Sequence, residues 1–105
     1  MIDNKQKVLN LLGLAQKAGK VISGTEMVAH AIQGKTVNLV LLASDSSENT
    51  IKEFVFLSEK FQIQLVKSFS SQEISDALGK KRKVVAVQDR GFARAMLDKL
   101  NKERD

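Results

Sequence analysis

The alternation of apolar and polar positions predicts helix, strand and helix in the first third of the chain. Apolar residues recur at helical spacing over residues 4–18, and Gly19 is placed to end this helix in a left-handed conformation. A short extended pair, residues 21–22, follows it. Ser23 and Glu26 have the spacing of a capping box, so we expect the second helix to begin there and to end at Gly34.

Two nearly continuous apolar runs, residues 37–43 and 84–87, predict strands that are covered on both faces. Both runs are too short for typical helices and are bounded by polar residues. Residues 63–66 predict a shorter strand. Helical patterns separate these strands, and their ends are marked by capping residues: Asp3 and Gln6, Ser70 and Glu73, Gly79, and Asp89.

The order of elements predicts an α/β fold, a three-layer α-β-α sandwich with a four-stranded, largely parallel or mixed sheet. Right-handed crossovers would bring the connections at 23–25, 44–47, 67–71 and 88–91 to one edge of the sheet. The connection at 80–83 precedes its strand and would lie at the opposite edge if that strand were parallel to the others. The pattern leaves open whether it meets the second helix.

Length and composition narrow the classes of function. With 105 residues the chain is expected to form a single domain, residues 1–105. It has no Cys and one His, which excludes disulfides, thiolate metal sites, cysteine nucleophiles and two-histidine metal sites. No apolar stretch approaches the roughly 20 residues of a membrane span, and no signal-type segment is present. We therefore expect a cytoplasmic protein without membrane contact, cofactor or metal.

The charge is unevenly distributed, although the net charge of the chain is only +5. Residues 1–20 carry four basic and one acidic residue, residues 21–79 carry four and seven, and residues 80–105 carry nine and four. Basic ends around a mildly acidic middle predict a surface for a polyanion, if the fold brings the basic segments together. The alternative is a soluble protein with scattered lysines.

The start of the second predicted helix is a candidate site for an anionic oxygen. It presents free backbone N–H groups and a glycine that permits close approach, at Ser23, Gly24, Thr25 and Glu26. Lys17 and Lys20 are near it in sequence. The alternative is that Ser23 and Glu26 only cap each other.

A run of four cations is the second candidate, and it consists of Lys80, Lys81, Arg82 and Lys83. The run lies in a short connection between a helix stop and a buried strand, so little entropy would be lost when it docks on phosphates. The alternative is a solvated charge run.

Signals for catalysis are weak. His30 follows Glu26 by four residues and shares its helix face, but it has no further metal-type partners. Asp45 and Asp89 follow the two apolar strands, where helix capping explains them more simply than catalysis. No phosphate loop and no nucleophile with a neighbouring base is present, so we expect no enzyme.

The aromatic residues argue against unstructured single strands as ligands. All five are Phe, and four fall on positions predicted to face the core. Only Phe69, and as a second choice Phe92, is left as a stacking platform. A folded RNA recognised by shape, phosphates and base edges suits the sequence better.

Three segments together resemble a known family over nearly the whole chain. They are Leu11 to Gly24, with Leu-Gly-Leu-Ala-Gln-Lys-Ala-Gly-Lys and Ser-Gly; Gly34 to Asp45, with Asn-Leu-Val-Leu-Leu-Ala-Ser-Asp; and Ser71 to Phe92, with Asp-Arg-Gly-Phe-Ala after the basic run. The chain is similar to the small bacterial members of the kink-turn RNA-binding ribosomal proteins, the "L seven A e" superfamily. The resemblance implies an α-β-α sandwich that binds kinked RNA through the start of helix two and a loop before the last strand.

The family pattern at helix two is Gly, a variable residue, Asn, Glu, two variable residues and Lys. Counted from Gly24, this sequence has Glu in place of Asn, Met in place of Glu and His in place of Lys, at Glu26, Met27 and His30; Thr25 occupies the variable position. Glu26 can accept from a base amino group but cannot donate, and Met27 offers only packing. The resemblance therefore predicts affinity that depends on Lys17, Lys20 and the basic run, with reduced base selectivity.

These observations predict non-catalytic binding of structured, kink-turn-like RNA in the translation apparatus by a monomer, with the ribosome as a further partner. The alternative is a protein-interaction module for ribosome or translation-factor assembly. It would use the acidic face of the third helix, formed by Glu48, Glu53 and Glu59. An enzyme that handles a small molecule or phosphate ranks third.

Overall fold

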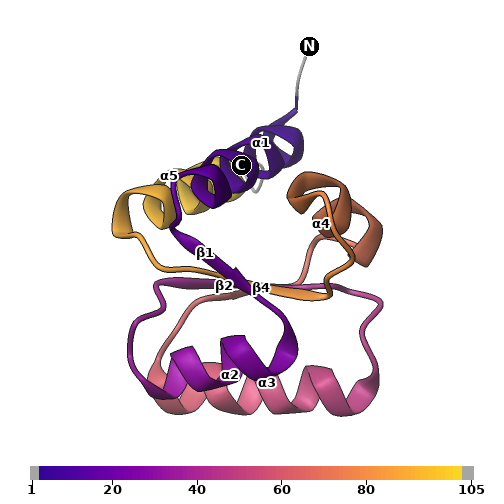
Figure 1. The fold of residues 1–105 in the computed structure, drawn as a ribbon, viewed down its shortest axis with the longest axis vertical. Helices are drawn as coiled ribbons and strands as arrows, with labels where there is room; N and C mark the ends of the chain where they lie inside the picture. Colours follow the sequence, from indigo (N-terminus) through magenta and orange to yellow (C-terminus); the bar gives the residue numbers. More distant parts are fainter. Residues whose placement is uncertain (1–2, 103–105) are drawn as a thin grey trace.

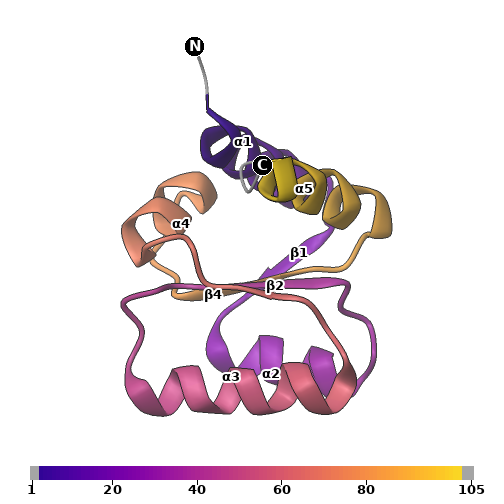
Figure 2. The ribbon, with the colours of Figure 1, turned by 180° about the vertical axis from the view of Figure 1, so that it is seen from behind.

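A computed structural model, which describes residues 3–102, has three layers (Figure 1). The helices are α1 (Asn4–Lys17), α2 (Thr25–Gln33), α3 (Glu48–Phe61), α4 (Ser71–Leu78) and α5 (Arg90–Lys102), and the strands are β1 (Val21–Ser23), β2 (Leu39–Leu42), β3 (Leu65–Val66) and β4 (Val84–Val87). Helices α1, α4 and α5 cover one face of the sheet, and α2 and α3 cover the other (Figures 1 and 2). The predicted α-β-α sandwich is confirmed.

The sheet is mixed, with the strand order β1-β4-β2-β3. β4 runs antiparallel to both of its neighbours, and β2 and β3 are the parallel pair. Of the two expected arrangements, largely parallel or mixed, the sheet has the mixed one. Because β4 is reversed, the connection at 88–91 lies at the opposite edge from those at 23–25, 44–47 and 67–71, and the connection at 80–83 takes its place beside them.

The direction of β4 could not be predicted because each of its residues is buried. In β2, Leu39 and Leu41 pack toward α1, α4 and α5, whereas Val40 and Leu42 pack toward α2 and α3. β4 divides its side chains between the two faces in the same way. An apolar run buried on both faces is typical of parallel sheets, but it does not distinguish a parallel strand from a covered antiparallel one, so the direction of β4 follows from the whole fold.

Capping at the starts of α1 and α4 follows the sequence. The Asp3 carboxylate accepts from the Gln6 N–H at 2.8 Å. Ser70 and Glu73 form a reciprocal capping box at the start of α4, and this helix ends at Gly79 with a left-handed φ of 76°. The hydrogen bond from the Ser70 N–H lowers the pKa of the Glu73 carboxyl, which keeps the cap ionised.

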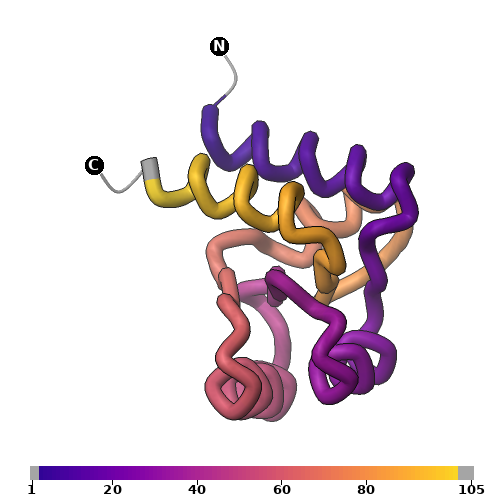
Figure 3. The backbone as a smooth tube through the Cα atoms, turned by 90° about the vertical axis from the view of Figure 1, so that its left-hand side faces the viewer, coloured from indigo at the N-terminus to yellow at the C-terminus, as the bar shows by residue number. Residues whose placement is uncertain are grey.

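Helices α1 and α5 lie side by side and antiparallel on one face of the sheet (Figure 3). Their packing closes the larger of the two apolar clusters, which contains Leu12, Phe69 and Met96. No helix within residues 3–102 is both long enough and apolar enough to cross a membrane.

Candidate nucleic-acid interface

The start of α2 is open to solvent. Gly24 precedes the helix with a φ of 102°, a conformation that side-chain-bearing residues rarely adopt, and no side chain caps the helix. The Gly24 N–H donates to the Val84 carbonyl at 3.0 Å, which ties the turn to β4. A Cβ atom placed on Gly24 would meet nothing within 4 Å. The first N–H groups of α2 thus face an unobstructed surface, as an anionic ligand requires.

The predicted capping box between Ser23 and Glu26 is wrong. The Ser23 hydroxyl accepts from Arg82 Nε at 3.0 Å, and Glu26 is exposed in the first turn of α2. Ser23 is the last residue of β1, which pairs with β4 beside the basic run. A partner distant in sequence has replaced the local one, and capping does not account for this helix start.

Arg82 holds the basic loop, residues 80–83, in place. Besides its bond to Ser23, its Nη1 donates to the Lys81 carbonyl at 2.7 Å. The Arg82 N–H donates to the Ser75 hydroxyl at 3.0 Å, and that hydroxyl donates to the Arg82 carbonyl at 3.2 Å. Arg82 is half-buried, whereas the three lysines of the loop are exposed. The four cations therefore divide into one anchor and three groups free to meet phosphates.

The basic loop and the start of α2 lie on the same surface. A groove of about 390 Å³ connects them, lined by Thr25, Lys81, Arg82, Lys83, Ser71, Gln72 and Ser75. The last three residues belong to α4 and were not predicted as part of the site. Their capping signal located the start of α4 in the sequence, but no local pattern indicates which helix start faces α2.

Asp45 fixes one wall of this region. Its carboxylate accepts from the Ser71 hydroxyl at 2.6 Å and from the Ser71 N–H at 2.8 Å. These two bonds, with a smaller contribution from the charge of Lys83, lower the pKa of Asp45. Asp45 thus joins the connection after β2 to the start of α4. At the other edge Asp89 accepts from the Phe92 N–H at 2.8 Å and caps α5. Helix capping does not explain Asp45, because α3 is capped by Ser47 and α4 by Ser70.

Two lysines that were predicted to contribute to the site, Lys17 and Lys20, do not lie at the start of α2. The Lys20 carbonyl accepts from the Gln88 N–H at 2.8 Å, which places it beside the far end of β4. Lys17 ends α1 three residues before it. The three residues of β1 separate this end from Gly24 by about 10 Å. Nearness in sequence therefore does not bring Lys17 and Lys20 to the open start of α2.

The remaining predicted residues lie along α2. Met27 is 61% exposed in the first turns of the helix, and His30 is exposed in its last turn. They extend the surface of Gly24 and Thr25 away from the basic loop.

The expected aromatic platform is absent at Phe69, because this side chain is fully buried under α1, α4 and α5. Phe92 is half-buried, and the exposed ring is that of Phe56 on α3, at 61%. Phe69 was expected at the surface because it falls outside the predicted helices and strands, and the local pattern gives no sign of its burial.

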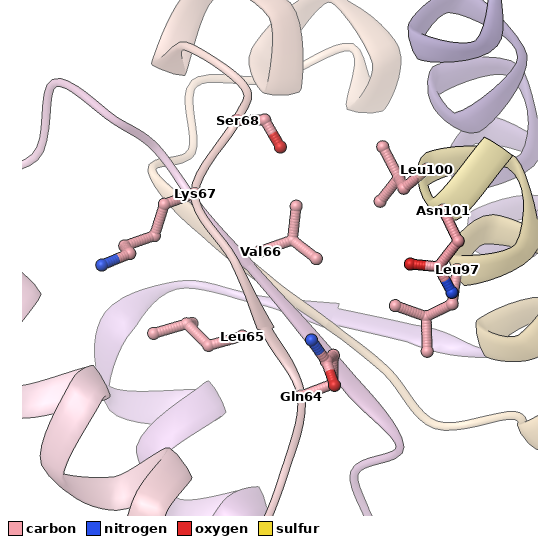
Figure 4. A pocket seen from close by; sticks show the side chains of 8 residues that line it. All are labelled: Gln64, Leu65, Val66, Lys67, Ser68, Leu97, Leu100 and Asn101. Carbon is pink, nitrogen blue, oxygen red and sulfur yellow. The ribbon is translucent and has the colours of Figure 1, made fainter. Parts of the chain in front are cut away.

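A second groove, of about 540 Å³, lies between β3 and α5, away from the residues described above (Figure 4). Val66 faces Leu97 and Leu100 across it, whereas Lys67 points away from α5. Within residues 3–102, no group of three or more His, Asp or Glu side chains could hold a metal ion.

The chain combines a mixed sheet between two helical layers with an open start of α2 beside a basic loop. The model of the ribosomal protein L7Ae/L30e/S12e/Gadd45 family matches residues 6–97, and the chain belongs to this family. The resemblance noted from the sequence is confirmed.

Two curated relatives have the name RNA-binding protein YlxQ. The protein of Enterococcus faecium is 41% identical over 91 residues, which cover 87% of this chain and 88% of the relative. The protein of Bacillus subtilis (strain 168) is 38% identical over 92 residues, which cover 87% of this chain and 92% of the relative.

Two solved structures have the same fold. A protein of unknown function from Bacillus halodurans is 35% identical, with a TM-score of 0.87, and the match covers 90% of this chain and 97% of that one. A 15.5-kDa RNA-binding protein of Giardia lamblia has a TM-score of 0.81 at 14% identity, with 94% and 88% covered. The second likeness concerns the fold alone.

Proposed function

We propose that the chain is a single, non-catalytic RNA-binding domain that recognises structured RNA of the kink-turn type. The main support is the hydrogen bond between Arg82 and Ser23, which holds the basic loop beside the open start of α2. Family membership and the names of the two relatives support RNA as the ligand.

The two parts of the surface have complementary tasks in this proposal. The first N–H groups of α2 and the helix dipole approach the RNA backbone or base edges at Gly24, where no side chain intervenes. The exposed lysines of the basic loop neutralise phosphates on the adjoining segment. A bent RNA presents both segments to one face of a small protein, whereas a straight duplex offers them along a line.

Selectivity for bases is expected to be modest. Glu26, Met27 and His30 line the exposed face of α2, and of these only His30 donates a hydrogen bond to a base or phosphate. Glu26 accepts from amino groups and repels phosphates. Most of the affinity therefore comes from backbone N–H groups and lysines, and it is sensitive to salt.

The proposed setting is the cytoplasm and the translation apparatus, with ribosomal or another structured RNA as the partner of a monomer. The test is calorimetric binding to a kink-turn RNA and to a straight duplex of the same length and charge. Tighter binding to the kinked RNA supports the proposal. Equal, weak and strongly salt-dependent binding to both would reduce the function to generic electrostatics.

A second candidate function is protein binding through α3. The ring of Phe56 is 61% exposed there, between Glu53 and Glu59. The face is not purely acidic, because Lys60 lies 5.8 Å from the centre of the Phe56 ring. If neither RNA binds, a Phe56→Ser variant that loses a protein partner while remaining folded would favour this function.

A further inference from the structure

Three connections meet at the edge of the sheet opposite the basic loop. The Gln88 N–H donates to the Lys20 carbonyl at 2.8 Å, and the Gln88 side-chain amide donates to the Thr36 hydroxyl at 2.9 Å. The Asn38 N–H donates to the Val87 carbonyl at 2.8 Å. The connections after α1, after α2 and after β4 thus form one continuous surface around Gln88, at the left-hand end of the sheet in Figure 1.

This surface is strongly basic. Its exposed cations, called here the distal basic surface, are Lys17, Lys20, Lys35, Arg90 and Arg94. Within residues 3–102 the ion pairs are Lys5–Glu73 and Lys52–Glu48, so none of the five is neutralised by a partner there. One oxygen of the nearest acid, Asp89, accepts from the start of α5. Asp98, one turn beyond Arg94, is the one acid that lines the same groove as Arg90 and Arg94.

Lys35 adds a conformational argument. Gly34 has an ordinary right-handed backbone, and the left-handed residue that follows α2 is Lys35, with a φ of 62°. Glycine adopts this conformation without strain, whereas lysine does not. A long cationic side chain therefore occupies a position where the backbone favours glycine.

We propose that the distal basic surface binds phosphates of a second RNA segment, one that continues from the RNA held at the basic loop and α2. The inference rests on the proposed function and extends it to a two-ended contact. The basic loop and the distal basic surface lie at opposite ends of strands of four residues, which separates them by about 13 Å. One arm of a folded RNA can span this distance.

The chemistry of the surface favours RNA over a protein partner. Arg90 and Arg94 line an open groove of about 350 Å³ beside Asn38, and guanidinium groups bind phosphate in a bidentate way. Protein interfaces are centred on buried apolar or aromatic anchors. Among the described residues the exposed large apolar side chains are Leu14, Met27 and Phe56; Leu14 lies one turn before Lys17, and none of the three belongs to the three connections.

The test compares two charge-matched triple variants of the whole chain. The distal variant is Lys35→Gln, Arg90→Gln and Arg94→Gln. The control is Lys7→Gln, Lys52→Gln and Lys67→Gln, which removes the same charge from exposed lysines that line neither the groove at the basic loop nor the groove of Arg90 and Arg94. Each is titrated at several salt concentrations with a kink-turn RNA with short arms and with two versions in which one or the other arm is longer by one helical turn.

We expect the unaltered protein to bind one long-armed RNA more tightly and with a steeper salt dependence than the short RNA. The distal variant should lower the slope of log K against log salt by about 2.7 on that RNA, since each lost phosphate contact contributes about 0.9. On the short RNA it should show no more than the small uniform loss expected from the removal of three charges. The control variant should keep both properties apart from a small uniform loss.

Three outcomes would overturn the second surface: no gain from either longer arm, a distal variant that matches the control on every RNA, or an equal loss on short and long RNA. A Lys17→Gln, Lys20→Gln variant tests the membership of these two residues, and a loss already present on the short RNA would assign them to the α2 site. Failure of the proposed function is visible separately, as no preference of the unaltered protein for the kinked RNA over a straight duplex.

Discussion

Removing the three free lysines of the basic loop while keeping its anchor is the most direct perturbation of the interface. The variant is Lys80→Gln, Lys81→Gln and Lys83→Gln, with Arg82 retained. All three side chains are exposed, and none takes part in a hydrogen bond or ion pair among the described residues. The bonds of Arg82 to Ser23 and Ser75 remain, so thermal stability should change little.

The expected size of the effect follows from counterion release. Three lost phosphate contacts lower the slope of log K against log salt by about 2.7. Between 50 and 200 mM salt, a fourfold change, the ratio of the two affinities therefore shrinks by about 40-fold. The variant is much weaker at low salt, and the difference largely disappears at high salt.

The assay is calorimetric titration with a kink-turn RNA at four or more salt concentrations, with the Lys7, Lys52 and Lys67 variant as the charge-matched control. Arg82→Gln is the complementary variant. It removes one charge but also the bond to Ser23, so stability falls by about 1 kcal/mol and the slope changes by about 1 unit or less. An unchanged slope in the triple lysine variant would refute the assignment of the loop to the RNA contact.

Three further outcomes are expected. Gly24→Val should cost about 1–3 kcal/mol of stability because of the positive φ, and it should weaken RNA binding because the new side chain covers the start of α2. Chemical denaturation measures the first effect and titration of the folded protein the second; equal losses would favour a structural role alone. Asp45→Asn should destabilise the protein at neutral pH, and the difference in stability between variant and unaltered protein should disappear in strong acid. The pKa of Asp45 is lowered in the folded state, so its stabilisation is present above its usual pKa of 3.8 and is lost as the pH falls through the lowered value. A difference in urea midpoint that does not depend on pH would contradict this. His30→Ala should weaken RNA binding, because it removes a hydrogen-bond donor from the exposed face of α2; unchanged affinity in a titration would exclude this contact.

The sequence predicted those parts of the fold that depend on neighbouring residues. The cap at Asp3, the capping box at Ser70 and the left-handed end at Gly79 each require only residues within one turn. The two apolar strands were located because their hydrophobic runs are unbroken. Their ends were placed one or two residues too far out for β2, which spans Leu39–Leu42 within the apolar run 37–43.

The sequence could not predict features that depend on distant partners. Ser23 has the spacing of a cap to Glu26, but its hydrogen bond goes to Arg82, which is 59 residues away. Lys17 and Lys20 are close to Gly24 in sequence, yet the extended strand between them carries them to the opposite edge of the sheet. Whether the basic loop would meet α2 depended on the direction of β4, which no local pattern specified.

The central position of β4 has a consequence for when the surface comes into existence during synthesis. β1 and β2 do not pair with each other, because β4 (residues 84–87) lies between them and pairs with both. A nascent chain that has emerged only to residue 83 contains the glycine turn and all four cations, but no strand joins them. Since β4 is the last strand to be synthesised, the two parts of the surface come together only after residues 84–87 have joined the sheet.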